Sequence, residues 1–375
     1  MNKIYRNQDI VNGVGNLEPL FSLNNFPVFQ GCIDQDVGKD LVSDLDFYIS
    51  TKTGMVQLNP LLPLNIIYQT EHNPGTTGQI WLDHHRAFAK FISKYNPKNV
   101  FEIGGSHGIL SEYYREYDDT TRWTILEPAP VPNHKLHAKL ITGFFTKDTE
   151  VDDLVDMIVH SHVLEHIYNP IEFFTSLQRL VIGTRMCFSI PNLELHIREK
   201  YTNALSFEHT YFCTEEFVEY WLAKYGFKLM CKHYHNDHSI FYSAYRDETD
   251  RLPVPNSYNK NKQLFQEFID YYKTAINEIN KIANDWQGPV YLFGGHIFSQ
   301  FLLCAGVDES LINCILDNSH LKQNRRLYGT NLMIQNPSIL KDIDNPLVIL
   351  KVGSYTEEIK KDIVNNINSR TQFLE

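Results

Sequence analysis

Short apolar runs alternate with helical patterns between residues 99 and 191, and this alternation limits the possible folds more than any other feature. We predict a helix around residues 109–117, between the first two strands. Strand, helix, strand order favours parallel pairing through right-handed crossovers. We therefore expect an α/β fold with a doubly wound, mostly parallel sheet of the Rossmann-like type. The predicted strands have the sequences NVFEIGG, RWTILEP, KLITGFF, DLVDMIVHS and MCFSIPN.

The length of 375 residues predicts two or three packed units. The first 78 residues mix short β-rich runs with prolines, which indicates a small β-rich domain. Further on, the polar segment RDETDRLPVPNSYNKNKQ carries two prolines and marks a boundary. A long helical pattern and a second strand–helix alternation follow it. We predict domains at 1–78, 79–248 and 249–375, the last a second Rossmann-like α/β unit.

Charge and composition argue against several classes of protein. With 34 basic and 45 acidic residues the formal net charge is -11, which argues against a partner held by a nucleic-acid backbone. The N-terminal residues lack an apolar run beside a basic segment, and no stretch reaches the roughly 18 apolar residues that span a bilayer. The six cysteines are never two or three residues apart, so they form no local metal-binding cluster. We expect a cytoplasmic protein without a membrane partner.

A glycine-rich turn follows the first predicted strand. Gly104, Gly105 and Gly108 let the backbone approach a ligand closely, and the next helix offers free amide groups to an anionic group. The spacing differs from the dinucleotide pattern G-x-G-x-x-G, and Glu102 before the glycines would repel a pyrophosphate. A cationic ligand without phosphate removes this objection. We expect these four residues to bind S-adenosylmethionine, which carries an ammonium, a carboxylate and a sulfonium.

A second acidic residue ends the next predicted strand. Glu127 lies about 20 residues beyond the glycine turn, where a carboxylate can accept hydrogen bonds from both hydroxyls of a ribose. Phe144 and Phe145 follow the third strand and can cover an adenine ring, although a pair of core aromatics is an equal alternative. A tight turn and a solvated strand end would be the purely structural reading of the glycines and of Glu127. Together, the glycine turn and Glu127 favour a cofactor that carries a nucleoside.

The strand DLVDMIVHS leads into a loop rich in histidine and carboxylate. If a helical turn begins near His162, then Glu165 and His166 lie on its face three and four residues further on. Such a set could supply a base, hold a metal, or simply stabilise the loop by hydrogen bonds. Because no ligand motif is complete, we predict no metal. We expect His162 and His166 to be reserve candidates for the catalytic base, with His162 also beside the cofactor.

Seven segments of the chain carry a resemblance to a known family. They are EIGGSHG, ILEP, DMIVHSHVLEHI, SIPN, SFEHTYFCTEEF, VYLFGGHIFSQFLLCAGV and LDNSHLKQNRRLYGTNLMI. The first four resemble the motifs of class I S-adenosylmethionine-dependent methyltransferases. The others extend the resemblance to the sugar C-methyltransferase family, which acts on nucleotide-linked sugars in antibiotic and cell-surface polysaccharide pathways.

In that family an N-terminal zinc-binding domain carries a C-x-x-C-G segment just before a V-Q-L strand. The corresponding segment here is STKTGMVQL, with Ser50 and Thr53 in place of the cysteines. Hydroxyls replace the soft thiolates that zinc requires. We therefore expect the domain to persist without its metal.

The resemblance also implies a Glu–His pair after the fifth strand, which maps onto Glu208 and His209. A histidine is suited to take a proton from the acceptor, and Glu208 or another carboxylate would fix its tautomer. A loop histidine bonded to the backbone is the alternative. The segment LKVGSYTEEI departs from the family, which leaves both oxygen and carbon open as the methyl acceptor.

The resemblance thus implies transfer of a methyl group from S-adenosylmethionine to a nucleotide-linked sugar. A hydroxyl oxygen is the preferred acceptor, and the enolate carbon of a keto sugar is the alternative. Two other classes of protein remain as alternatives, an oxidoreductase and a non-catalytic binding protein. FGGHIFSQ, with Asp317 about 20 residues on, could hold a nicotinamide dinucleotide in an oxidoreductase, although the third glycine is missing. The other is a protein that binds a sugar nucleotide without turnover.

Overall fold

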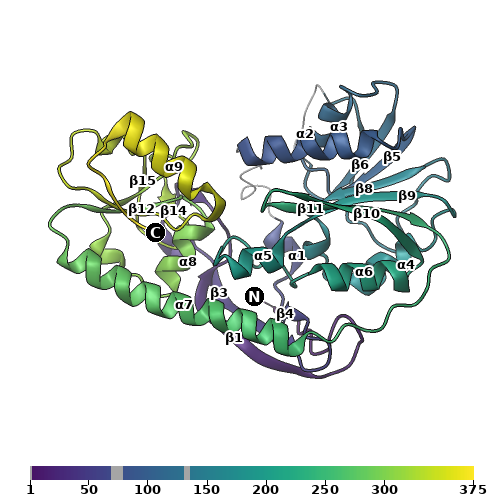
Figure 1. Ribbon diagram of the computed structural model, residues 1–375, viewed down its shortest axis with the longest axis horizontal. Helices are drawn as coiled ribbons and strands as arrows, with labels where there is room; N and C mark the ends of the chain where they lie inside the picture. The colour runs from purple at the N-terminus through teal and green to yellow at the C-terminus, as the bar shows by residue number, and fades with distance from the viewer. Residues whose placement is uncertain (1, 69–78, 131–135) are drawn as a thin grey trace.

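The computed structural model describes residues 2–68, 79–130 and 136–375. A large sheet lies between two layers of helices, and a smaller α/β unit stands beside it (Figure 1). Strands from the N-terminal residues and the long helix α7 (Tyr258–Asp285) run below both units in this view (Figure 1).

The large sheet has seven strands in the order β10-β11-β9-β8-β5-β6-β7. Strands β5 to β9 pair in parallel, whereas β11 pairs antiparallel with both β9 and β10. The chain moves outward from β5 in both directions, so the carboxyl ends of β5 and β8 flank the point where ligands bind in such sheets. The bounds are β5 (Asn99–Ile103), β6 (Arg122–Glu127), β7 (Lys139–Thr142), β8 (Met157–Ser161), β9 (Arg185–Pro191), β10 (Phe227–His235) and β11 (Ser239–Arg246).

Helices cover both faces of this sheet, which explains the near-continuous apolar sequences of its central strands. On one face, Phe88 of α2 packs in a cluster with Val100 and Val159 of the sheet. On the other, Trp221 of α6 shares a core with Ile158. The predicted α/β fold with a doubly wound, mostly parallel sheet is confirmed. The covering helices are α2 (Gln79–Ser93) and α3 (Ile109–Tyr114) on the first face, and α4 (Pro170–Leu177) and α6 (Glu215–Lys224) on the second.

The N-terminal residues form an antiparallel sheet in the order β1-β3-β4. The edge strand β4 continues into the large unit, because Leu58 N donates to Thr210 O at 2.9 Å and Phe212 N donates to Val56 O at 2.8 Å. The predicted domain boundary at residue 78 lies outside the described residues. The bounds are β1 (Leu17–Pro27), β3 (Val42–Ser50) and β4 (Val56–Leu58).

The C-terminal residues form a five-stranded parallel sheet in the order β15-β13-β12-β16-β17. Helix α7 leads into it with 28 residues, about 42 Å of helix, and contacts β1 and β3 on the way. The short strand β2 (Cys32–Ile33) pairs with β14 (Arg326–Leu327), which ties this unit to the N-terminal one. The other elements are β12 (Val290–Phe293), β13 (Cys314–Leu316), β15 (Ile334–Gln335), β16 (Leu347–Ile349), β17 (Gln372–Leu374), α8 (Ile297–Cys304) and α9 (Thr356–Asp362).

Short helices complete the described part of the chain. Among the described residues, no helix combines the length and the apolar character needed to cross a bilayer. The short elements are α1 (Leu64–Ile67), α5 (Leu193–Arg198), 3-10 helices at Val37–Lys39, Leu164–His166, Glu309–Leu311, Pro337–Leu340 and Gly353–Tyr355, and a π-helix at Ile363–Ile367.

Candidate active site

The turn between β5 and α3 has the backbone shape that its glycines allow. Gly104 and Gly108 have φ values of 72° and 73°, in the left-handed region that side chains disfavour. A Cβ on Gly105 would come within 2.6 Å of Ile125 Cγ2, so any larger residue would displace the turn from the sheet. A Cβ on Gly104 would meet Val163 Cγ2 at the same distance, which shows how closely the loop after β8 packs on the turn.

Glu102 lies beneath this turn. Its Oε2 accepts a hydrogen bond from Trp123 Nε1 at 2.7 Å, and a Cβ on Gly105 would come within 2.8 Å of its carboxyl carbon. Burial raises the pKa of Glu102 to about 7. The structure therefore gives Glu102 a supporting position under the turn, while its contact with a cofactor stays a prediction.

Glu127 stands at the carboxyl end of β6, beside the turn. Its side chain bridges two backbone segments, because Oε2 accepts from Ser106 N at 2.9 Å and Oε1 accepts from Ala129 N at 3.0 Å. The two aromatic residues after β7 separate. Phe144 is 45% exposed, with its ring 6.0 Å from that of Tyr68, whereas Phe145 packs on Phe173 at 5.5 Å. Of the two, Phe144 has the more accessible ring, and its contact with an adenine stays a prediction.

His162 follows β8 in an unusual conformation. Its φ of 52° is left-handed, so it lies outside the turn that we predicted to begin near it; the 3-10 turn spans Leu164–His166 instead. The imidazole still reaches Glu165, with Nδ1 3.6 Å from Oε1, and its Nε2 lies 2.7 Å from Ser239 Oγ. The expected neighbourhood of His162 and Glu165 is therefore present, although a helical repeat does not produce it.

Four side chains from three segments meet beyond this turn, and we call them the acceptor cluster: Tyr68, His166, Glu208 and His209. Tyr68 Oη lies 3.2 Å from His166 Nδ1, and Glu208 Oε2 lies 3.7 Å from the same nitrogen. The rings of His166 and His209 have centroids 5.0 Å apart. The structure thus brings together three of the predicted catalytic residues and adds Tyr68.

The segment that carries Glu208 and His209 is held on both sides. Its next residue, Thr210, donates from N to Glu165 O at 2.9 Å and from Oγ1 to Ile167 O at 3.0 Å. On the other side, the carbonyl oxygen of Thr210 accepts from Leu58 N of β4. The N-terminal sheet therefore fixes the position of the acceptor cluster.

A backbone carbonyl, and not a carboxylate, fixes the tautomer of His209. Its Nδ1 lies 3.1 Å from Ala204 O, and because a carbonyl only accepts, Nδ1 carries the proton and Nε2 keeps its lone pair. Glu208 is directed to His166 instead, so its predicted role in orienting His209 is wrong. Burial lowers the pKa of His209 to about 4, which keeps the imidazole neutral at neutral pH.

A second group of imidazoles was missed by the sequence analysis. His84 of α2 and His238 of the β10–β11 turn lie beside His162, with ring centroids 5.1 Å and 5.2 Å from it. Trp81 packs against His162 and His238. These residues are far apart in the sequence, and the abundance of histidine, 16 residues in all, was the one available signal.

Comparison with known proteins identifies this part of the chain. Residues 80–232 match a family model described as a methyltransferase domain. This segment is a methyltransferase domain. The predicted enzyme class is thereby confirmed, and the narrower resemblance to sugar C-methyltransferases stays a prediction. No curated protein matches the chain.

Solved structures similar to the chain include three from different organisms. The PH0226 protein from Pyrococcus horikoshii is 13% identical, with a TM-score of 0.37, over 46% of this chain and 93% of its own. An S-adenosylmethionine-dependent methyltransferase from Mesorhizobium loti is 12% identical, with a TM-score of 0.36, over 44% and 100%. Human N-acetylserotonin methyltransferase in complex with S-adenosylmethionine is 11% identical, with a TM-score of 0.36, over 48% and 62%. Each likeness covers less than half of this chain, and the domain assignment rests on the family model.

Outside the methyltransferase domain, a hydrogen-bonded network stands where the resemblance implies zinc ligands. The buried Asp9 accepts through Oδ2 from Ser50 Oγ at 2.7 Å and from Thr53 Oγ1 at 2.8 Å. Its Oδ1 accepts from Val11 N at 2.8 Å. The two hydroxyls that replace the cysteines are therefore satisfied by a carboxylate.

The C-terminal unit repeats the pairing of an acidic residue with a glycine turn. Asp317 Oδ2 accepts from Gly295 N at 2.8 Å and from Lys322 Nζ at 2.9 Å, and its Oδ1 accepts from Ser319 N at 2.9 Å. Because a lysine neutralises this carboxylate and three donors already bond to it, the position offers little to a ribose. The geometry does not favour the nicotinamide alternative.

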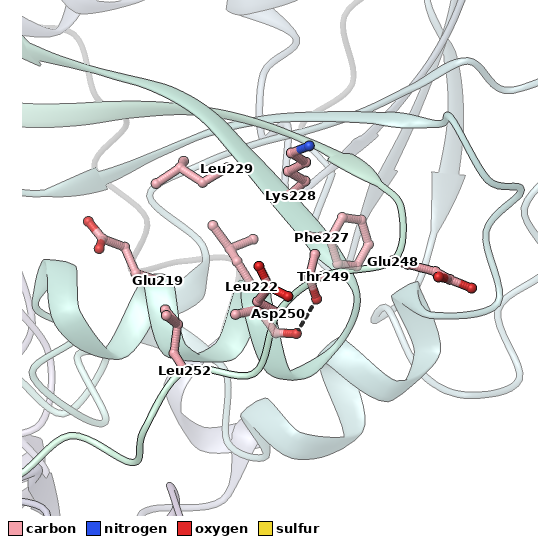
Figure 2. Close-up of a pocket in the computed structure, with 10 residues that line it drawn as sticks. Glu219, Leu222, Phe227, Lys228, Leu229, Glu248, Thr249, Asp250 and Leu252 are labelled. Carbon is pink, nitrogen blue, oxygen red and sulfur yellow. Dashed lines mark hydrogen bonds between the residues drawn. The ribbon is translucent and has the colours of Figure 1, made fainter.

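A surface hollow lies at the opposite edge of the methyltransferase domain (Figure 2). Helix α6, the start of β10, Glu248, Thr249, Asp250 and Leu252 line it, and Thr249 Oγ1 donates to Ala223 O at 2.6 Å there. Phe227, which lines this hollow, pairs with Arg246 at the end of β11. This end of β11 lies beside the amino-terminal ends of the parallel strands. The hollow contains none of the predicted site residues, so it is separate from the candidate active site.

Proposed function

We propose that the chain transfers a methyl group from S-adenosylmethionine to a hydroxyl group of a nucleotide-activated sugar, in cell-surface polysaccharide or glycoside biosynthesis. The proposal rests on the position of Val163, which connects the glycine turn to the acceptor cluster. One side of this residue packs on the glycine turn at Gly104, and the loop that it begins carries His166 of the acceptor cluster. A donor on the turn and an acceptor at His209 would therefore lie side by side.

The donor site is the carboxyl edge of β5 and β6. Glu127 bonds to two backbone amides, and a carboxylate has about four lone-pair positions, so it can also accept from ribose hydroxyls. Phe144 supplies an exposed ring for the adenine. The glycines keep the backbone close to the methionine part of the cofactor.

The acceptor cluster supports oxygen as the nucleophile. In the transition state the hydroxyl oxygen bonds to the methyl carbon while the bond from that carbon to sulfur breaks and the demethylated donor leaves. The hydroxyl becomes strongly acidic as this happens, so a weak base suffices to take the proton during the transfer. His209 fits this demand, because its Nε2 keeps a lone pair and burial lowers its pKa to about 4. Removing a proton from carbon beforehand would need a stronger base. The enzyme then acts chiefly by aligning donor and acceptor.

The nucleotide-sugar class rests on the resemblance of the segments around Glu208 and in the C-terminal unit. One contact supports a shared substrate site. A Cβ on Gly353 would come within 3.2 Å of the Tyr201 ring, so the C-terminal unit touches the connection that leads from β9 to Glu208. A sugar nucleotide could then contact both units.

Mass spectrometry of sugar nucleotides, incubated with the protein and a methyl-deuterated donor, tests this function. We expect a labelled product whose methyl group NMR places on oxygen. A label on carbon would support the keto-sugar alternative, and hydride transfer with a nicotinamide cofactor would support the oxidoreductase. Donor binding without any labelled sugar nucleotide would contradict the proposed substrate class.

A further inference from the structure

We propose that the unit built on the seven-stranded sheet holds a transition-metal ion, with zinc as the expected species, between His84, His162 and His238. We call these residues the histidine trio. One nitrogen of each ring can be chosen so that all three lie within 4.8 Å of one another. The proposal does not depend on the identity of the methyl acceptor.

The three rings converge on one atom. Ser239 Oγ lies 3.1 Å from His84 Nδ1, 2.7 Å from His162 Nε2 and 2.6 Å from His238 Nδ1. Tetrahedral zinc with bonds of about 2.0–2.1 Å places its ligands roughly 3.4 Å apart, so small rotations of the rings would enclose an ion beside Ser239 Oγ. The hydroxyl, a water molecule or a substrate oxygen would complete the coordination.

The elements that carry the trio are independent of one another. His84 lies on α2, His162 follows β8, and His238 closes the turn between β10 and β11. The far nitrogen of His84 is also engaged, with Nε2 2.9 Å from Ser161 Oγ. The ring is therefore oriented toward the centre by a contact on its outer side, as metal-binding histidines are.

Glu165 provides a separate observation that points to a cation. Its side chain is fully buried, and neither carboxylate oxygen has a hydrogen-bond partner among the described residues. Its Oε1 lies 3.6 Å from His162 Nδ1, on the side of the ring that faces away from Ser239. A buried carboxylate without a counter-charge is costly, whereas a metal on Nε2 would place a proton on Nδ1 and positive charge beside the carboxylate. This is the carboxylate–histidine–metal arrangement of many sites.

The ligand set selects the class of ion. Three imidazoles suit zinc, copper or nickel, whereas magnesium and calcium prefer carboxylate and carbonyl oxygens. Glu165, His166 and His209 form a second possible set within 4.8 Å. We assign the ion to the trio, because Glu165 then orients His162 and the lone pair of His209 stays free for the acceptor.

Metal content and cobalt spectroscopy of the full chain, purified without a histidine tag, test the site. We expect one zinc per chain by elemental analysis, and visible absorption bands of tetrahedral cobalt(II) when the chelated protein is titrated with that ion. In His238→Gln, at an incompletely buried position, the bands should disappear while the thermal unfolding transition and donor affinity persist. Glu165→Gln should weaken zinc binding about 10–100-fold, the range for an outer partner.

Two matched variants locate the ion. His235→Gln changes a neighbouring histidine outside the trio, whose ring centroid is 5.9 Å from that of His84, and should leave zinc affinity unchanged. Ser239→Ala removes the central hydroxyl and should keep the metal, which separates a metal site from a purely hydrogen-bonded cluster. Absence of stoichiometric metal, or cobalt bands that survive in His238→Gln, would overturn the proposal. So would loss of metal in His166→Gln with full retention in His238→Gln.

Discussion

His209 donates its Nδ1–H to the carbonyl oxygen of Ala204 at 3.1 Å, and this bond fixes which ring nitrogen is left to accept a proton. The bond depends on the conformation of the chain between the two residues. Strand β4 anchors the chain directly after this stretch, because Leu58 N donates to Thr210 O at 2.9 Å. The N-terminal sheet thus supports the segment that carries the proposed base.

Replacement of His209 should slow the reaction without weakening donor binding. In His209→Ala we expect kcat to fall about 10²–10⁴-fold, the usual contribution of a general base. Donor affinity, measured by calorimetry, should stay near that of the wild type. Near-normal turnover in this variant, with loss in His162→Ala or His166→Ala, would place the base on the loop after β8.

The pH dependence of kcat should reflect the lowered pKa of His209. Only the neutral imidazole accepts a proton, so the rate rises with pH through the pKa of the group, which burial places at about 4. The rise in rate therefore falls at lower pH than an ordinary histidine would give, and this group should contribute no change between pH 6 and 9. Profiles of kcat against pH for the wild type and for Glu208→Gln, at saturating substrates, check this prediction. A His209-dependent rise of kcat centred near pH 6.5 in both proteins would contradict the lowered pKa.

The N-terminal unit should contain no structural zinc, because the carboxylate of Asp9 binds the hydroxyls of Ser50 and Thr53. We expect the metal content of Ser50→Ala and Thr53→Ala to equal that of the wild type. Asp9→Ala should lower the free energy of unfolding by about 1–3 kcal/mol, since two buried hydroxyls lose their acceptor. Zinc that depends on these hydroxyls and whose chelation unfolds the chain would refute this prediction.

The ion pair between Asp40 and Arg326 should stabilise the contact of the N-terminal and C-terminal units. Two of its N–O distances are 2.6 Å, and the carboxylate and guanidinium are 2% and 9% exposed. Breaking such a buried pair costs about 3–5 kcal/mol, so Asp40→Ala should lower stability in urea by that order. The neighbouring pair of Asp34 and Arg325 is exposed, and Asp34→Ala should change stability by less than about 1 kcal/mol. Equal losses of stability in Asp40→Ala and Asp34→Ala would contradict a stabilising role of the buried ion pair.

Much of the methyltransferase domain was predictable from the sequence, because its central strands are buried on both faces and read as apolar runs. These strands end at Ile103 and Glu127, two residues and one residue before the ends of the predicted runs at Gly105 and Pro128. The closeness of Glu127 to the glycine turn was predictable for the same reason, since parallel strands bring their carboxyl ends to one edge, and the binding of a cofactor there stays a prediction.

Other parts of the site depend on packing between distant segments. Tyr68 reaches His166 through the docking of the N-terminal unit, and His84 meets His238 through the packing of α2 on β11. No local pattern contains either contact. The partner of Glu208 was missed because adjacent residues can point to different neighbours in an irregular segment.

The C-terminal unit should bind no dinucleotide, because Asp317 already accepts bonds from Gly295 and Lys322. Calorimetry with NAD should show no binding. Hydrogen exchange with donor and sugar nucleotide should show protection from about residue 288 onward, as this unit closes over the substrate. Protection by NAD instead would reverse the assignment.

The affinity of Glu127→Ala for S-adenosylmethionine, measured by calorimetry, tests most directly whether the cofactor binds between the glycine turn and the end of β6. The wild type should bind the donor, and the variant should lose about 1.5–3 kcal/mol of binding free energy, the range for hydrogen bonds to a charged group. Glu116→Ala, an exposed change on the same unit, serves as the control and should bind like the wild type. Equal donor affinity in wild type and Glu127→Ala would contradict a cofactor site between the glycine turn and the end of β6.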